Sequence, residues 1–171
     1  MLIWLDGTYG VGKSSVANEL MEIMTEVIIM NADTYYSKMM KEGLINIFGG
    51  TTPQNKKDFL LLFRSEIEQA LLVNPIVVVD MALTQPESKA LLYDYFDTDK
   101  TIHIILTADT NCINQRIDNC KERDVLFAKS WKTNNEQFLA NNYSDGLVID
   151  TTYLSISETA KQIQQIICQS S

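Results

Sequence analysis

The chain has 171 residues, of which 46% are hydrophobic, with a formal net charge of −8 and a pI near 4.6. This length suits one domain, and the hydrophobic content is sufficient for a core that needs no disulfide or metal to be stable. A surface this acidic repels nucleic-acid backbones and anionic lipids, so we expect neither a nucleic-acid partner nor membrane association.

The cysteine content suits a reducing compartment. The three cysteines, Cys112, Cys120 and Cys168, are far apart, and His103 is the only histidine. This arrangement disfavours both a disulfide framework and a zinc site. The apolar run at residues 2–5 is too short for a signal peptide or a membrane span. We therefore expect a cytoplasmic protein, and the sequence leaves monomer and homodimer open.

Short apolar runs alternate with longer amphipathic stretches along the chain. The runs lack polar alternation, as buried parallel strands do, and predict strands at residues 2–5, 27–30, 76–79, 102–106 and 147–149. The stretches predict helices at about residues 13–25, 34–42, 55–73, 86–95, 109–119, 131–142 and 155–168. The last helix opens with a capping box, because Ser155 is followed three residues later by Glu158. This alternation predicts an α/β fold, with a parallel sheet covered by helices on both faces.

Polar residues follow several of the expected strands. They occupy the segment from Asp6 onward and residues 31–33, 80–85, 107–109 and 150–152. The carboxyl ends of parallel strands share one edge of the sheet, and ligands of open α/β sheets bind there. Roughly half of the acids in these segments are expected to be helix N-caps only, because Asp is a good capping residue.

The first strand leads into a complete phosphate-binding loop. Residues 7–14 match the pattern G-x-x-x-x-G-K-[ST], between a buried strand and an amphipathic helix. Its glycines allow successive backbone N–H groups to converge on phosphate oxygens at a helix N-terminus. We expect Lys13 to bridge the β- and γ-phosphates and the Ser14 hydroxyl to ligate magnesium. The residues expected to contact the nucleotide here are Gly7, Thr8, Tyr9, Gly10, Val11, Gly12, Lys13, Ser14 and Ser15.

Asp80 closes the third expected strand, at the edge of the sheet where Ser14 lies. A carboxylate there is suited to hold magnesium directly or through water. The alternative is an N-cap or turn residue. The metal role is favoured, because a phosphate-loop site needs such a carboxylate.

This pattern resembles the small P-loop kinases of the nucleoside-monophosphate and shikimate-kinase kind over nearly the whole chain. A helical insertion separates the second and third strands, and Arg116 precedes a short polar segment, residues 120–132, at the position of the lid. The resemblance implies a three-layer P-loop fold with strand order 2-3-1-4-5, an acceptor-binding insertion at residues 34–73, and ATP and Mg²⁺ as cofactors. Residues 148–152 resemble the segment that borders the adenine, which implies a nucleotide contact from Thr151. The place of Arg116 at the base of the lid implies a nucleotide contact from it as well.

A further likeness is to the tunicamycin-resistance proteins. It is carried by Ile3-Trp4 before the glycine loop, by Phe63-Arg64 in the insertion, and by the turn at residues 81–86. Asp80 departs from that group, in which we expect a non-acidic residue. This departure favours ordinary magnesium chemistry over the substrate of the resistance proteins.

The chain has only three arginines, Arg64, Arg116 and Arg123. The expected fold puts them in the acceptor-side helix, at the base of the lid and in the lid. Arginine is suited to bidentate contact with phosphate or carboxylate. We therefore expect Arg64 to grip the acceptor, and Arg116 and Arg123 to neutralise charge during phosphoryl transfer. The alternative is a surface arginine paired with local acids, such as Glu122 beside Arg123.

Asp33 follows the second expected strand. In the kinases that the chain resembles, an acid here contacts the acceptor hydroxyl and can act as a base. Capping of the helix at residues 34–42 is an equally good alternative. Tyr36 is expected to contact the acceptor, although most aromatic residues at helical spacing face the core. The segment at residues 43–53 reads as a mobile loop that could close over the substrate.

Together these features predict a phosphotransferase that uses ATP and Mg²⁺ to phosphorylate a hydroxyl of a nucleoside-like or antibiotic-like small molecule. The alternative is a nucleotide-dependent binding or resistance protein, which sequesters an apolar ligand without phosphorylating it.

Overall fold

The computed structural model describes residues 1–45, 52–96, 100–119 and 125–170, without the side chains of Phe127 and Trp131. Within these ranges the strands form one five-stranded parallel sheet, in the order β2-β3-β1-β4-β5. The strands are β1 (Leu2–Gly7), β2 (Val27–Asn31), β3 (Ile76–Asp80), β4 (Thr101–Thr107) and β5 (Leu147–Asp150). The α-helices are α1 (Lys13–Ile23), α2 (Ala32–Lys41), α3 (Lys57–Val73), α4 (Pro86–Leu91), α5 (Thr110–Asp118), α6 (Val125–Asn142) and α7 (Ile156–Ser170). Two short 3₁₀ helices are η1 (Pro53–Asn55) and η2 (Tyr93–Tyr95). The expected fold class and strand order are confirmed.

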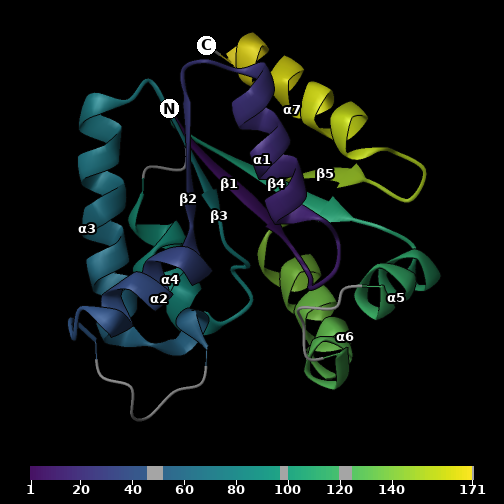
Figure 1. The fold of residues 1–171 in the computed structure, drawn as a ribbon, viewed down its shortest axis with the longest axis horizontal. Coiled ribbons are helices and arrows are strands. Elements are labelled where there is room, and N and C mark those ends of the chain that lie inside the picture. Colours follow the sequence, from purple (N-terminus) through teal and green to yellow (C-terminus); the bar gives the residue numbers. More distant parts are fainter. Residues whose placement is uncertain (46–51, 97–99, 120–124, 171) are drawn as a thin grey trace.

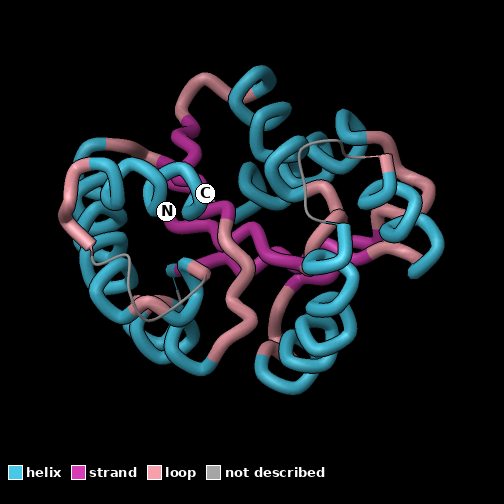
Figure 2. Tube along the Cα trace, turned by 60° about the horizontal axis from the view of Figure 1, so that its bottom comes forward, coloured by secondary structure: helices cyan, strands magenta, loops and turns pink. Residues whose placement is uncertain are grey.

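The sheet separates two apolar layers, because successive side chains of a strand point to opposite faces. Leu2 and Trp4 of β1 pack in a core with α2, α3 and α6, whereas Ile3 and Leu5 pack against α1 and α7. These four side chains are at most 3% exposed. Helices therefore lie on both sides of the strands (Figure 1, Figure 2).

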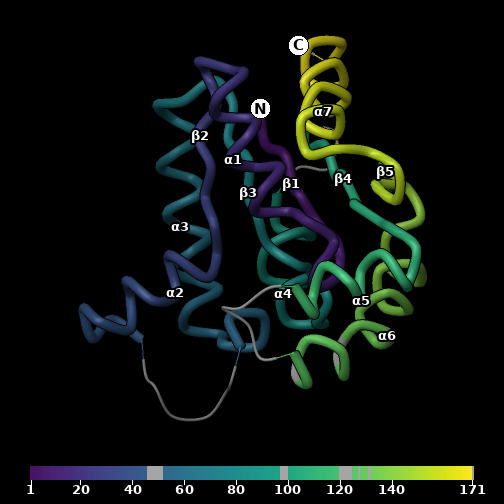
Figure 3. The backbone as a smooth tube through the Cα atoms, turned by 45° about the vertical axis from the view of Figure 1, so that its right-hand side comes forward, coloured from purple at the N-terminus to yellow at the C-terminus, as the bar shows by residue number. Residues whose placement is uncertain are grey.

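The parallel arrangement places all strand ends of one kind together. The carboxyl ends of the strands, the loop after β1 and the start of α1 lie at one end of the molecule, and both termini lie at the other end (Figure 3). No helix in the described ranges is long and apolar enough to cross a membrane.

Helix α2 begins two residues earlier than expected, because Asn31 caps it. The Asn31 side chain accepts a hydrogen bond from the Thr34 N–H at 2.9 Å, and the helix starts at Ala32. Asp33 therefore lies inside the first turn. The alternative in which Asp33 is only the helix cap is wrong.

Other boundaries also differ from expectation. The final helix has its capping box, with the Ser155 N–H donating to Glu158 Oε2 at 2.8 Å. The helix expected at residues 86–95 is instead α4 followed by η2, with a break at the fully buried Leu92. Helix α6 begins at Val125, so part of the expected lid is helical.

The expected lid and the expected insertion are only partly described by the structure. Residues 120–124 of the expected lid lie outside the described residues, and so do residues 46–51 of the expected insertion.

The close approach of β1 and β4 requires glycine at position 7. Gly7 has a φ of +136°, and a Cβ there would lie 2.5 Å from the backbone oxygen of Leu106. Gly43, with a φ of +71°, ends α2, and a Cβ there would meet nothing within 4 Å. A residue with a side chain would be strained by the positive φ at either position, but only at position 7 would its Cβ also collide with backbone.

We therefore expect Gly7→Ala to lower the free energy of unfolding by about 3 kcal/mol, and Gly43→Ala by only about 1 kcal/mol. Urea unfolding of both variants checks this difference. Equal losses would show that the strands can separate enough to admit a methyl group.

Candidate nucleotide and acceptor site

The phosphate loop turns back on itself between β1 and α1. Gly7, Gly10 and Gly12 have φ values of 136°, 78° and 108°, which glycine adopts without steric cost. The Lys13 ammonium donates to the Gly7 oxygen at 2.8 Å and to the Thr8 oxygen at 3.3 Å. The cation therefore lies across the loop, at the N-terminus of α1, where the helix dipole also favours an anion.

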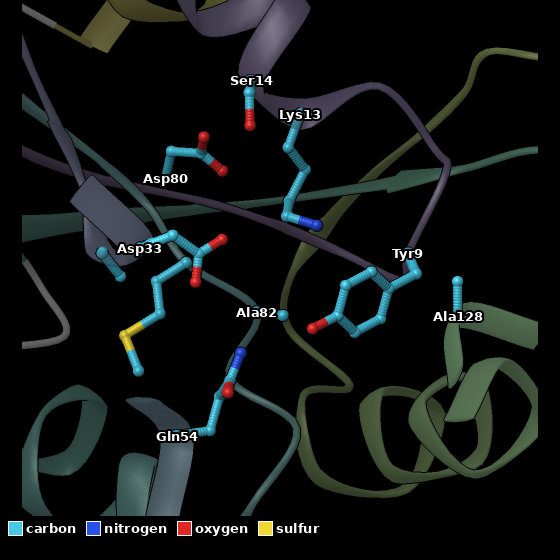
Figure 4. Close-up of a pocket in the computed structure, with 10 residues that line it drawn as sticks. Tyr9, Lys13, Ser14, Asp33, Gln54, Asp80, Ala82 and Ala128 are labelled. Carbon is cyan, nitrogen blue, oxygen red and sulfur yellow. The ribbon is translucent and has the colours of Figure 1, made fainter. Parts of the chain in front are cut away.

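A cavity of about 230 Å³ opens beside the loop (Figure 4). It is lined by Tyr9, Lys13, Ser14, Ala32, Asp33, Gln54, Asp80, Met81, Ala82 and Ala128. We call it the first cavity. Figure 4 shows the Lys13 ammonium and the carboxylates of Asp33 and Asp80 directed toward the same space. The structure thus brings four predicted site residues to one cavity. Lys13 and Ser14 come from α1, Asp33 from α2 and Asp80 from β3.

Asp80 is held in place by its neighbour on β2. It is 4% exposed, and its Oδ2 accepts a hydrogen bond from Asn31 Nδ2 at 2.6 Å. Asn31 lies opposite Asp80 in the register of β2 and β3, and the same side chain caps α2. One amide therefore orients the carboxylate and starts the helix that carries Asp33.

The oxygen atoms near the loop fit a magnesium ion. Ser14 and Asp80 line one cavity and offer a hydroxyl and a carboxylate, and Mg²⁺ prefers few protein oxygens together with waters and substrate phosphates. Among the described residues, no group of three or more His, Cys, Asp or Glu side chains could hold a metal by itself.

A second buried carboxylate, Asp6, fixes the start of the phosphate loop through hydrogen bonds. Asp6 is fully buried, and its Oδ1 accepts from the N–H groups of Gly7 at 2.6 Å and Leu83 at 3.1 Å. Its Oδ2 lies 2.9 Å from His103 Nε2. In the described part of the chain His103 Nδ1 is buried without a hydrogen-bond partner, which fits a neutral imidazole that donates through Nε2.

Tyr143 completes this anchor, which consists of Asp6, His103 and Tyr143. Its hydroxyl donates to the Leu83 oxygen at 3.0 Å, and its ring meets the His103 ring edge-on at 4.6 Å. Burial raises the pKa of Tyr143 well above its usual value, so the hydroxyl remains a donor. Because Leu83 is held through both its N–H and its oxygen, the wall formed by Met81 and Ala82 has a set position relative to the loop.

We expect His103→Phe to lower the free energy of unfolding by about 3 kcal/mol, because it leaves Oδ2 of the buried Asp6 carboxylate without its hydrogen-bond donor. Adding Asp6→Asn should recover at least about 1 kcal/mol, since the charge is removed while an amide oxygen still accepts from Gly7 and Leu83. Urea unfolding of both single variants and the double variant measures the coupling. Additive losses would contradict the contact.

A second cavity, of about 260 Å³, lies on the other side of the phosphate loop. It is lined by Gly10, Val11, Gly12, Ser15, Val16, Arg116, Ile117, Thr151, Leu154, Ile156 and Thr159. Arg116 donates to the Val11 oxygen at 2.9 Å, and to the hydroxyl and backbone oxygens of Thr151 at 3.0 and 2.8 Å. Thr151, from the segment expected to border the base, and Arg116, expected to contact the nucleotide, therefore both line this second cavity. The role of Arg116 in neutralising charge during transfer stays a prediction.

Two other expected residues, Arg64 and Tyr36, line neither cavity. The Arg64 guanidinium lies 4.0 Å from the centre of the Tyr95 ring, and Tyr36 packs edge-on against Phe59 at 5.2 Å. Arg123 lies outside the described residues.

Gln54 lines the first cavity although no sequence pattern pointed to it. It belongs to η1, which is brought to the cavity by the packing of the insertion. A single amide in a three-residue element has no periodicity or motif, so sequence offered no signal.

One sequence in the chain, Asn55-Lys56-Lys57-Asp58, has the Asn-Lys-x-Asp form of a guanine signature. It lies at the junction of η1 and α3, where Lys56 is buried and the Asp58 side chain accepts from the Phe59 N–H. None of its residues lines the second cavity. The structure therefore does not place this sequence at a nucleotide base.

Comparison with known proteins supports the fold. No protein-family model matches the chain, and no curated protein matches it in sequence. The solved structure of the tunicamycin resistance protein of Deinococcus radiodurans matches with a TM-score of 0.71 and 19% identity, over 97% of this chain and 94% of that one. Shikimate kinase from Bacteroides thetaiotaomicron matches with a TM-score of 0.65 and 11% identity, over 98% of each chain. Thymidylate kinase from Candida albicans matches with a TM-score of 0.65 and 16% identity, over 98% of this chain and 91% of that one. The chain therefore has the P-loop kinase-like fold that its sequence pattern predicted.

Proposed function

We propose that this protein is a phosphotransferase that uses ATP and Mg²⁺ to phosphorylate a hydroxyl of a small molecule. The observation that carries the proposal is the position of the phosphate loop between two cavities. The second cavity has apolar walls and Arg116, which suit a nucleotide base. The first holds Lys13 and two carboxylates, which suit the terminal phosphate, its cation and an acceptor.

Each residue of the site has a distinct part in this proposal. The loop N–H groups and Lys13 bind the β- and γ-phosphates, and Ser14 and Asp80 hold Mg²⁺. The bound ion supplies charge neutralisation of the phosphate oxygens. Asp33 orients the acceptor hydroxyl and takes its proton.

The transfer itself exchanges one phosphorus–oxygen bond for another. The acceptor oxygen bonds to the γ-phosphorus, the bond to the bridging oxygen breaks, and ADP leaves with that electron pair. Arg116 and Arg123 would neutralise charge as the bond breaks. For Arg116 this requires its guanidinium to leave the oxygens of Thr151.

We expect Lys13→Ala to weaken binding of ATP with Mg²⁺ at least about tenfold, because the ammonium group at the loop is lost. Isothermal titration calorimetry measures the change. Lys161→Ala, on the exposed side of α7, is the matched control and should bind as the parent does. Equal affinity of the Lys13 variant and the parent, or no binding by either, would refute nucleotide binding at this loop.

Asp33→Asn separates the phosphotransferase from the sequestering alternative. We expect the variant to keep ATP affinity within about twofold, while substrate-dependent ADP release falls at least about 100-fold, because the general base is lost. ADP release in a screen of nucleosides and antibiotics, with mass spectrometry of the product, measures turnover. Asp145→Asn, an exposed acid outside both cavities, is the control. Tight ATP binding with no phosphorylated product in the parent would favour the sequestering alternative.

A further inference from the structure

A third cavity, of about 280 Å³, lies between α6 and the β4–β5 side of the sheet. Among the described residues it shares no lining residue with the first or the second cavity. We propose that it is a separate binding site for a small, uncharged bicyclic aromatic compound that carries one hydrogen-bond donor, as indole does. The site does not depend on the proposed phosphotransferase function.

The position of α6 leaves room over the last two strands. Within the described ranges α6 packs mainly on α5 and β1, and less on β4 and β5. Ile105 of β4 and Val148 of β5 are register partners, so their side chains share one face of the sheet. Ile105 packs in the same core as Leu139 of α6, so this face is the one turned toward the helix. The third cavity therefore lies between a helix and a strand pair.

The walls of the third cavity are mostly apolar. Ile105 and Val148 line it from the sheet, Leu139 and Ala140 from α6, and Ile113 from α5. Ile105, Ile113 and Leu139 are at most 5% exposed, whereas Val148 is 63% exposed. The cavity thus has a buried interior and opens to solvent beside β5, where a ligand can enter.

The volume fits two fused rings. An apolar cavity of about 150 Å³ binds benzene, and pockets for small molecules begin at about 300 Å³. The third cavity, at about 280 Å³, is nearly twice the size of the benzene cavity. A bicyclic compound therefore fills it better than a single ring does, and the burial of its apolar surface favours binding.

One buried polar group in the lining has no partner. Thr8 lines the third cavity and is 3% exposed, and its hydroxyl makes no hydrogen bond to any described residue. Buried hydroxyls are normally paired, because an unpaired one is costly. Rotation about the Cα–Cβ bond exchanges the hydroxyl and the methyl group of threonine, so the hydroxyl can turn to a ligand without movement of the backbone. An N–H group of the ligand would then supply the missing partner.

The other polar lining groups have partners or face solvent. The hydroxyls of Thr107 and Tyr143 donate to backbone oxygens. Glu136 forms an ion pair one turn back along α6, and Ser144 is exposed. Thr8 is therefore the group that we expect a buried donor of the ligand to meet.

The proposed site borders the phosphate loop without overlapping the cavities assigned to the nucleotide and the acceptor. Thr8 belongs to the loop, and its backbone oxygen accepts from the Lys13 ammonium at 3.3 Å. Its side chain, however, lines only the third of the three cavities. A ligand in the third cavity should therefore bind together with ATP.

Indole and benzofuran test the proposal, because they have the same ring size and differ in the N–H group. The full chain, labelled with ¹⁵N, is titrated with each compound, and the amide shifts report both affinity and location. We expect indole to bind with a Kd below about 1 mM and at least about fivefold more tightly than benzofuran. The amides of Thr8, Ile105 and Leu139 should shift, and saturating ATP with Mg²⁺ should not displace indole.

Variants of the lining test the two parts of the site. Thr8→Val keeps the side-chain shape without the hydroxyl and should lower the affinity for indole to that for benzofuran, whereas Thr8→Ser should retain the preference. Ala140→Phe adds a ring at an exposed lining position and should weaken both compounds at least about tenfold. Ala90→Phe, at an exposed position of α4 outside all three cavities, is the matched control.

Three results would overturn the inference. The first is no binding of indole, or amide shifts that lie away from the third cavity. The second is displacement of indole by ATP, because the compound would then occupy the place of the nucleotide base. The third is equal affinity for indole and benzofuran, or an unchanged preference in Thr8→Val. None of these results bears on phosphoryl transfer, and a protein that releases no ADP could still bind indole in this way.

Discussion

The buried carboxylate of Asp6 is the interaction on which the site depends. A charge removed from water is costly unless every lone pair finds a donor. Here Oδ1 accepts from the N–H groups of Gly7 and Leu83, and Oδ2 contacts His103 Nε2. These three contacts offset the cost of burying the carboxylate. As a result, the first residue of the phosphate loop and the turn after β3 share one anchor. The loop and the wall of the first cavity cannot move independently without breaking it.

A second polar contact, made by Asn31, links the carboxylate of Asp80 to the helix that carries Asp33. Asn31 joins Asp80 on β3 to the start of α2, and the first turn of α2 carries Asp33. The amide works in both directions: its N–H₂ donates to the carboxylate, and its oxygen caps the helix. The two carboxylates of the first cavity thus have a set relative position, although they lie on different elements. Such a fixed position would serve the proposed phosphoryl transfer, a reaction that depends on positioning more than on covalent chemistry by the protein.

The distribution of cations distinguishes the two sides of the phosphate loop. Arg116 lies in the second cavity and donates to the Val11 oxygen, whereas the Lys13 ammonium donates to the Gly7 oxygen of the loop. The first cavity combines this ammonium group with two carboxylates, an amide and apolar groups among its described lining residues. The fold is shared with kinases of several substrates, so this local chemistry, rather than the fold, is what bears on the acceptor.

Several features followed from sequence alone because they are written in short, contiguous patterns. The apolar runs, the glycine loop with Lys13 and Ser14, and the Ser155–Glu158 capping box depend on residues a few positions apart, and the structure has all of them. The parallel sheet and its order followed from the alternation of strands and helices and from the family resemblance.

Tertiary structure alone decided how distant side chains are used. Asp6 meets His103 across 97 positions, because β1 and β4 are neighbours in the sheet. Packing directed Arg64 to Tyr95 and brought Gln54 into the first cavity, and neither outcome leaves a pattern in the sequence. The choice of Asn31 over Asp33 as helix cap is also tertiary, since Asn31 is the residue that can donate to Asp80 while it accepts from Thr34. Local motifs determine which chemistry is available, and long-range contacts decide where each group is directed.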